Sequence, residues 1–222
     1  MTNGSRRSCS GTGDLIMTKL VTAYRKSAVY KPEYVRRLKA DAKRFGYELI
    51  VVEDSRWHGW WCKMALFDPA IKGDILHIDL DTIITGSLDD LLNASGSMML
   101  RDFYFPIRLA SGVMRWTEEH RQIIWREWIK APRLAMGQFE GVAKGGDGAF
   151  LAHVIRLHSL SVQRVQDQFP GQVCSFKVDC AKSPPPDARL ICYHGSPRPH
   201  ETGWRVAGHN RSVPARALRC PR

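Results

Sequence analysis

Two aspartates, Asp79 and Asp81, follow a short apolar run, Ile75–Ile78, and are the residues best suited to chemistry in this chain. In extended chain, side chains two positions apart point the same way, so both carboxylates are expected to face one cation. Open α/β sheets bind ligands at this carboxyl edge of their strands. Carboxylate oxygens favour Mg²⁺ or Mn²⁺, with substrate phosphates completing the coordination. The alternative is a pair of ordinary turn residues, because Asp-x-Asp alone is a common pattern.

The segments around these acids alternate between strand-like and helix-like patterns. Short apolar runs predict strands at residues 19–24, 48–52, 75–78, 97–100, 112–114, 173–178 and 190–193. Apolar residues at helical spacing predict helices at residues 32–45, 61–67, 117–130 and 147–157. Such alternation favours a single three-layer α/β domain with a mostly parallel central sheet.

Several residues mark where these helices begin and end. Pro32 suits the first turn of one helix, and Gly46 is expected to end it. Thr117 and Asp147 are expected to cap two later helices. The solvent-facing side of the first helix is expected to carry its basic residues, Arg36, Arg37, Lys39 and Lys43.

Length and composition exclude several classes of protein. The chain has 222 residues, of which 44% are hydrophobic and 25% are charged, as in an ordinary globular domain. This composition excludes a disordered chain, a collagen and a coiled-coil rod. No apolar run approaches the roughly 20 residues of a membrane-spanning helix, so no transmembrane segment is expected.

The charge is strongly positive. Lys and Arg number 33 against 22 Asp and Glu, which gives a net charge of +11. This balance favours an anionic partner such as nucleic acid, a nucleotide, an acidic glycan or a membrane surface, although it can also serve solubility alone. Residues 1–15 are expected to form a disordered basic tail, residues 16–207 the folded domain and residues 208–222 a basic C-terminal tail.

The cysteines and the N-terminus favour a cytoplasmic protein. The six cysteines include no C-x-x-C pair, and the chain is too long for a disulfide scaffold. The first residues are polar and lack the apolar core of a secretory signal. Free thiols in a reducing compartment are therefore expected.

Four segments resemble a known family in matching order. GDILHIDLDTIITGSLDDLL (residues 73–92) is similar to the metal-binding segment of GT-A-fold glycosyltransferases, most closely the glycogenin and lipopolysaccharide galactosyltransferase group, family 8. WCKMALF (61–67) resembles its Lys-bearing helix, ASGVM (110–114) its N-S-G-V-[ML] strand and CYHGSPRP (192–199) its late H-x-G-x-x-K-P segment. Including WHGWWCK and MLRDF, the likeness is strongest to small bacterial and phage proteins of this type.

This resemblance implies a role for each matched residue. Asp79 would contact the donor ribose and the metal, Asp81 would bind the metal directly, and His194 would be the third protein ligand. A histidine in an ordinary loop is the alternative for His194. Lys63 and Arg198 would contact the donor phosphates or sugar, with Arg198 in place of the family's Lys. The alternative for both is a solvated surface cation.

Further positions follow from the same resemblance. Contacts to the donor are expected from Ala23, Tyr24, Leu80, Ser111, Gly146 and Gly195. Asp102 and Asp147 are expected near the transferred sugar, with a plain helix cap as the alternative for Asp147. Trp57, Trp60 and Trp61 either stack on sugars or bases or anchor the core.

The implied activity is metal-dependent transfer of a sugar from a nucleotide-sugar donor, with UDP as the expected nucleotide, to an acceptor hydroxyl with retention of configuration. Two other interpretations stay open. Asp-x-Asp after an apolar strand is also the nucleophile and acid/base pair of haloacid-dehalogenase-like phosphatases. The basic charge also fits a nucleic-acid-binding protein on a transferase fold, or a transferase whose acceptor is nucleic acid, such as modified phage DNA.

Overall fold

The computed structural model describes residues 17–141, 145–180 and 183–202. A six-stranded sheet forms its centre, in the order β2-β1-β3-β6-β5-β7. These strands are β1 (Lys19–Tyr24), β2 (Ile50–Glu53), β3 (Ile75–Ile78), β5 (Ser97–Arg101), β6 (Leu109–Trp116) and β7 (Val162–Arg164). Only β6 runs antiparallel to its neighbours, so the predicted mostly parallel sheet is confirmed.

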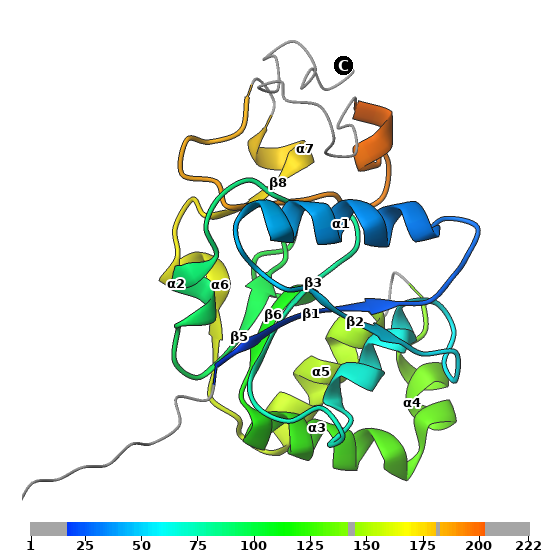
Figure 1. Ribbon diagram of the computed structural model, residues 1–222. Coiled ribbons are helices and arrows are strands. Elements are labelled where there is room, and N and C mark those ends of the chain that lie inside the picture. The colour runs from blue at the N-terminus through cyan, green and yellow to red at the C-terminus, as the bar shows by residue number, and fades with distance from the viewer. Residues whose placement is uncertain (1–16, 142–144, 181–182, 203–222) are drawn as a thin grey trace, which may run out of the picture.

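Helices cover both faces of this sheet (Figure 1). One face packs against α1 (Pro32–Arg44). The other packs against the 3-10 helix η1 (Gly59–Phe67), α3 (Glu118–Lys130), α4 (Pro132–Phe139) and α5 (Gly146–Leu157). The side chains of β1 alternate between the two faces of the sheet, as expected for a strand. Leu20 packs on the α1 side and Val21 on the other.

A second sheet of three strands lies beyond α1, in the order β4-β9-β8 (Figure 1). Its strands are β4 (Thr82–Ile84), β8 (Val173–Ser175) and β9 (Leu190–Cys192). The remaining short elements are α2 (Asp89–Leu92), α6 (Val165–Gln168), α7 (Phe176–Asp179) and η2 (Pro199–Thr202). The sequence patterns predicted two of these strands but did not separate them from the central sheet.

The expected helix and strand ends are partly confirmed. Thr117 caps α3 by accepting a hydrogen bond from the His120 amide. Asp147 as a helix cap is wrong, because Gly145 occupies that position with φ of 89° and Asp147 lies in the first turn of α5. The strand predicted at residues 173–178 ends at Ser175, whose hydroxyl caps α7 by accepting from the Val178 amide.

The expected basic tails, residues 1–15 and 208–222, lie outside the described residues. Within the described residues, no helix is both long and apolar enough to cross a membrane. The four cysteines of the described chain, Cys62, Cys174, Cys180 and Cys192, are buried and free of disulfides, as expected.

Candidate active site

The turn that joins β3 to β4 carries Asp79 and Asp81. The Asp79 amide donates to Gly112 of β6 at 2.9 Å, and the Thr82 amide donates to the Asp79 carbonyl at 3.0 Å. The second bond closes a turn, so the expectation that the two acids share extended chain is wrong. Both side chains nevertheless border the same cavity at the carboxyl end of β3.

A buried arginine from α1 fixes the backbone of this turn. Arg37 Nη2 donates to the carbonyls of Leu80 and Thr82 at 2.6 and 2.9 Å, and its Nη1 pairs with Asp41 at 2.9 Å. Arg37 is 5% exposed, so its assignment to the solvent-facing side of the helix is wrong. A guanidinium presents five donors in a rigid fork, which suits it to hold two carbonyls and a carboxylate at once.

The Asp79 carboxylate lies within a cluster of polar side chains. Lys63 of η1 lies between Asp79 and Asp147, at 3.1 and 3.2 Å from their oxygens, and donates to Ser111 at 3.0 Å. His77 Nε2 also lies 3.2 Å from Asp79 Oδ1. Burial alone would raise the pKa of Asp79, but Lys63 and His77 more than offset it and hold that pKa below its usual range.

The same cluster keeps Lys63 charged. Burial would lower its pKa, but the carboxylates of Asp147 and Asp79 outweigh burial and raise it. The alternative of a solvated surface cation is therefore wrong for Lys63, which is 8% exposed.

The Asp81 carboxylate has different partners. The Tyr30 hydroxyl donates to Asp81 Oδ2 at 2.9 Å, and Arg198 Nη1 donates to the same oxygen. Arg198 is therefore also an ion-paired residue rather than a free surface cation. Burial, followed by the negative charge of Asp79, raises the pKa of Asp81 above its usual range.

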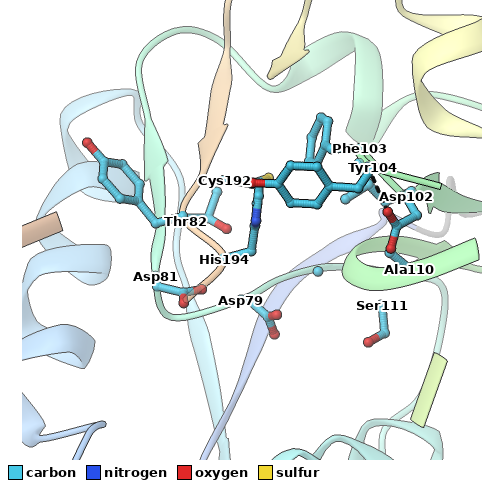
Figure 2. Close-up of a pocket in the computed structure, with 13 residues that line it drawn as sticks. Asp79, Asp81, Thr82, Asp102, Phe103, Tyr104, Ala110, Ser111, Cys192 and His194 are labelled. Carbon is cyan, nitrogen blue, oxygen red and sulfur yellow. Dashed lines mark hydrogen bonds between the residues drawn. The ribbon is translucent and has the colours of Figure 1, made fainter. Parts of the chain in front are cut away.

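A cavity of about 210 Å³ opens beside the two acids (Figure 2). Asp102, Phe103 and Tyr104 line it on the side away from Asp81, His194 lies between them and the acids, and Ser111 also lines it (Figure 2). The loop that carries Phe103 and Tyr104 joins β5 to β6. Several predicted residues from distant segments thus meet at one cavity.

His194 borders the cavity but is held by other groups. Its Nε2 lies 2.6 Å from the Ser175 hydroxyl, and its ring stacks on Phe103 and meets Tyr104 edge-on, at centroid distances of 5.6 and 5.2 Å. Burial, followed by the positive charge of Lys177, lowers the pKa of His194, which favours the neutral imidazole that metal ligation requires.

The donor chemistry around the cavity fits a hard divalent cation. Asp79 and Asp81 supply carboxylate oxygens, and His194 supplies an imidazole. In the described part of the chain, no three His, Cys, Asp or Glu side chains are already gathered around a common point as a metal requires. A cation at these residues would compete with Arg198 for Asp81 Oδ2 and with Ser175 for His194 Nε2.

Other predicted residues lie farther from this cavity. Ala23 and Tyr24 end β1 and are buried in opposite core clusters. Gly146 packs beneath Trp60, whose Nε1 would lie 2.7 Å from an added Cβ, so it has a packing role of its own. Gly195 has φ of 78° and lies near Lys177 rather than among the acids.

The three tryptophans of the WHGWWCK segment separate. Trp61 is fully buried, stacks on Trp128 and donates to Glu140 at 2.8 Å, so it anchors the core. Trp57 packs edge-on against Trp128 and is half-buried. Trp60 is the exposed member, with 37% of its surface accessible.

Sequence reasoning missed Tyr30, Phe103 and Tyr104 as site residues, and it placed Arg37 on the wrong face. Phe103 directly follows Asp102 in a run of three aromatic residues, so an unusual loop composition was the available signal. Tyr30 had no such signal, because only the fold brings it to Asp81 across 51 positions of sequence.

Comparisons with known proteins address the fold. No family model matches the chain, and no curated protein matches it. Among solved structures, it is similar to a glycosyltransferase involved in glycosylation of the major capsid of PBCV-1 (13% identity, TM-score 0.55, 83% of this chain and 96% of that one). It is also similar to an active-site mutant of LgtC (10% identity, TM-score 0.55, 90% and 94%).

A third similar structure is the apo form of the glycosyltransferase GlyE from Streptococcus pneumoniae TIGR4 (16% identity, TM-score 0.50). That match covers 89% of this chain but only 57% of GlyE, so this chain spans little more than half the length of that protein. Together with the mostly parallel sheet, these similarities confirm the expected fold: the chain has a GT-A-like α/β fold.

Proposed function

We propose that this protein is a metal-dependent glycosyltransferase that moves a sugar from a nucleotide-sugar donor, with UDP as the expected nucleotide, to a hydroxyl group of an acceptor. The observation that carries the proposal is the turn of Asp79 and Asp81, which borders a cavity at the carboxyl end of β3. The GT-A-like fold and the four matching sequence segments support it.

Asp79, Asp81 and His194 would hold the metal, as Mn²⁺ or Mg²⁺. When bound, the cation supplies positive charge that neutralises the diphosphate leaving group. Arg198 would add a guanidinium for phosphate oxygens, and Lys63 would hold Asp79 and Asp147 in place. Ser111 and Asp102 border the same cavity and would contact the donor or the transferred sugar.

In the reaction, an acceptor oxygen forms a bond to the anomeric carbon while the bond from that carbon to the diphosphate oxygen breaks. The acceptor proton leaves with the departing nucleoside diphosphate. We propose that attack occurs on the face from which the diphosphate departs, which retains the configuration. Phe103 and Tyr104, which line the same cavity, would limit access of water to the reacting carbon.

A donor screen tests this function. Nucleotide sugars with Mn²⁺ should raise the midpoint of thermal unfolding, because a ligand at 100 times its Kd adds about 2.7 kcal/mol to stability. For a chain of this size that corresponds to roughly 5 to 10 °C. Absence of a shift with every nucleotide sugar would contradict the proposal. Release of phosphate from a simple phosphoester would instead support a haloacid-dehalogenase-like phosphatase.

We propose further that the acceptor is a large anion, such as nucleic acid or an acidic glycan. The net charge of +11 supports this. Beside the cavity, the exposed rim of Tyr104, Phe105 and Ile107 ends in Arg108, whose guanidinium lies 4.8 Å from the Phe105 ring centroid. Aromatic faces with an adjacent cation suit bases or anionic sugars.

Salt dependence tests the acceptor class, with double-stranded DNA and heparin as probes. Binding of a polyanion should weaken steeply as salt rises, because counterions are released on association. Removal of residues 1–15 and 208–222 should weaken it further and leave nucleotide-sugar binding almost unchanged. Affinities that respond neither to salt nor to this removal would favour a small or neutral acceptor.

A further inference from the structure

The carboxylate of Asp81 already has a cation beside it. Arg198 Nη1 donates to Asp81 Oδ2, and the Tyr30 hydroxyl donates to the same oxygen at 2.9 Å. Arg198 Nη1 also donates to the Tyr30 hydroxyl oxygen at 2.9 Å, and its guanidinium lies 5.2 Å from the Tyr30 ring centroid. These groups together satisfy one oxygen of the carboxylate that the proposed function assigns to a divalent cation.

Asp79 is neutralised as well, but its cation is fixed in place. Lys63 has three partners, Asp79, Asp147 and Ser111, and only 10% of its side-chain surface is exposed. Arg198 is nearly twice as exposed, at 19% of its side chain. In the described residues Asp81 is its only ion-pair partner, and it belongs to the irregular segment between β9 and η2. Arg198 is therefore the cation that can leave with the loss of one ion pair, where Lys63 would lose two.

We propose that Arg198 is an internal counter-ion of the metal site, which holds Asp81 until a divalent cation replaces it and then turns to the phosphate oxygens of a nucleoside diphosphate. This inference rests on the proposed function, because it takes Asp81 as a metal ligand. A guanidinium and a divalent cation beside one carboxylate repel each other and compete for its negative charge, so a metal ion at Asp81 favours release of Arg198 from Oδ2. The released guanidinium presents a planar fork that matches phosphate oxygens.

The two parts of this role change the affinity for the metal in opposite directions. Without nucleotide, Arg198 weakens metal binding because the two cations compete for Asp81. With a nucleoside diphosphate present, Arg198 strengthens metal binding because it gains phosphate contacts when it leaves Asp81. Coupling between two ligands is reciprocal, so metal should strengthen nucleotide binding by the same factor. A residue that only contacts phosphate would show the second effect without the first.

The experiment measures the Kd of Mn²⁺ by the electron paramagnetic resonance signal of the free ion, with and without UDP as the probe. In Arg198→Met, Mn²⁺ alone should bind about tenfold more tightly than in the wild type. The enhancement of Mn²⁺ binding by UDP should shrink by more than that tenfold factor, so that with UDP the wild type binds Mn²⁺ more tightly than the variant; the usual range for coupled sites is about 5- to 150-fold. Neither measurement requires transfer activity.

Two further variants separate this role from a general effect on the site. Arg198→Lys keeps the positive charge and should bind Mn²⁺ alone nearly as weakly as the wild type. If the Met variant fails to fold, Arg198→Gln removes the charge in its place. Tyr30→Phe removes one neutral hydrogen bond from Asp81 and should change the Mn²⁺ affinity less than Arg198→Met does.

The possible outcomes distinguish the counter-ion role from the proposed function. If Arg198→Met binds Mn²⁺ alone no better than the wild type, while the wild type binds Mn²⁺ with UDP, the counter-ion role is overturned and the proposed function stands. If Arg198→Lys binds Mn²⁺ alone as tightly as Arg198→Met should, the positive charge is not what competes, and the role is again overturned. If no variant binds Mn²⁺ with or without UDP, the metal-dependent function fails, and the inference fails with it.

Discussion

Asp81→Asn is expected to abolish sugar transfer and metal-dependent binding of the donor. An amide cannot supply the anionic oxygen that a hard divalent cation prefers. A bound metal contributes several kcal/mol to stabilisation of the transition state, and about 1.4 kcal/mol corresponds to a tenfold change in rate. The expected loss is therefore on the order of 1000-fold in kcat/KM, measured with the donor that the thermal screen identifies.

Asp90→Asn is the matched control for this variant. Asp90 lies on α2 outside the cavity, and its partner in the described chain is Gln172 at 3.0 Å. It should leave both activity and Mn²⁺ binding unchanged. EDTA should remove activity from the wild type, and added Mn²⁺ should restore it. Full activity of Asp81→Asn, or of the wild type in EDTA, is incompatible with the proposed metal role.

Local sequence patterns were enough to predict the main elements that position the site. The residues of β1 and β3 were predicted with their observed bounds, because both are short apolar runs between polar residues. Thr117 was recognised as a cap because capping depends on a few neighbouring residues. The position of Asp79 and Asp81 after β3 followed from these local features, since the acids directly succeed a buried strand.

Local sequence patterns could not predict contacts between residues that lie far apart in the sequence. Arg37 looked like one of several surface cations on an amphipathic helix, yet it is buried because β4 and its turn pack over that face. The second sheet explains this difference, since its strand β4 was not predicted at all. An arginine on the covered face of a helix can be recognised only when the element that covers it is known.

The orientation of His194 is a second example. The sequence places it in a segment rich in Gly and Pro, which suggests a free loop side chain. In the structure Ser175, Phe103 and Tyr104 fix its ring, and these residues come from β8 and from the loop between β5 and β6. Which atoms a side chain contacts depends on such tertiary partners, whereas its approximate position followed from the family resemblance.

Lys63→Met is expected to lower the free energy of unfolding by about 3–5 kcal/mol, the usual cost when one partner of a buried ion pair is removed. Methionine fills similar space but supplies no charge, so Asp79 and Asp147 would be left close together without their shared cation. For a chain of this size the loss corresponds to a fall of roughly 10 °C in the midpoint of thermal unfolding. Calorimetry without metal or donor measures it.

Two comparisons show whether the carboxylates cause this loss. Lys130→Met removes an exposed lysine that pairs with Glu127 on α3, and such a surface change should stay within about 0.5 kcal/mol of the wild type. Asp147→Asn added to Lys63→Met removes one of the two unpaired charges. It should recover part of the stability, because residues in one ion-pair cluster do not contribute independently.

If Lys63→Met unfolds at the wild-type temperature, or if the double variant is destabilised by the sum of the single losses, Lys63 does not hold these two carboxylates together. The lowered pKa of Asp79 would then have to come from its other close partner, His77, whose Nε2 lies 3.2 Å away.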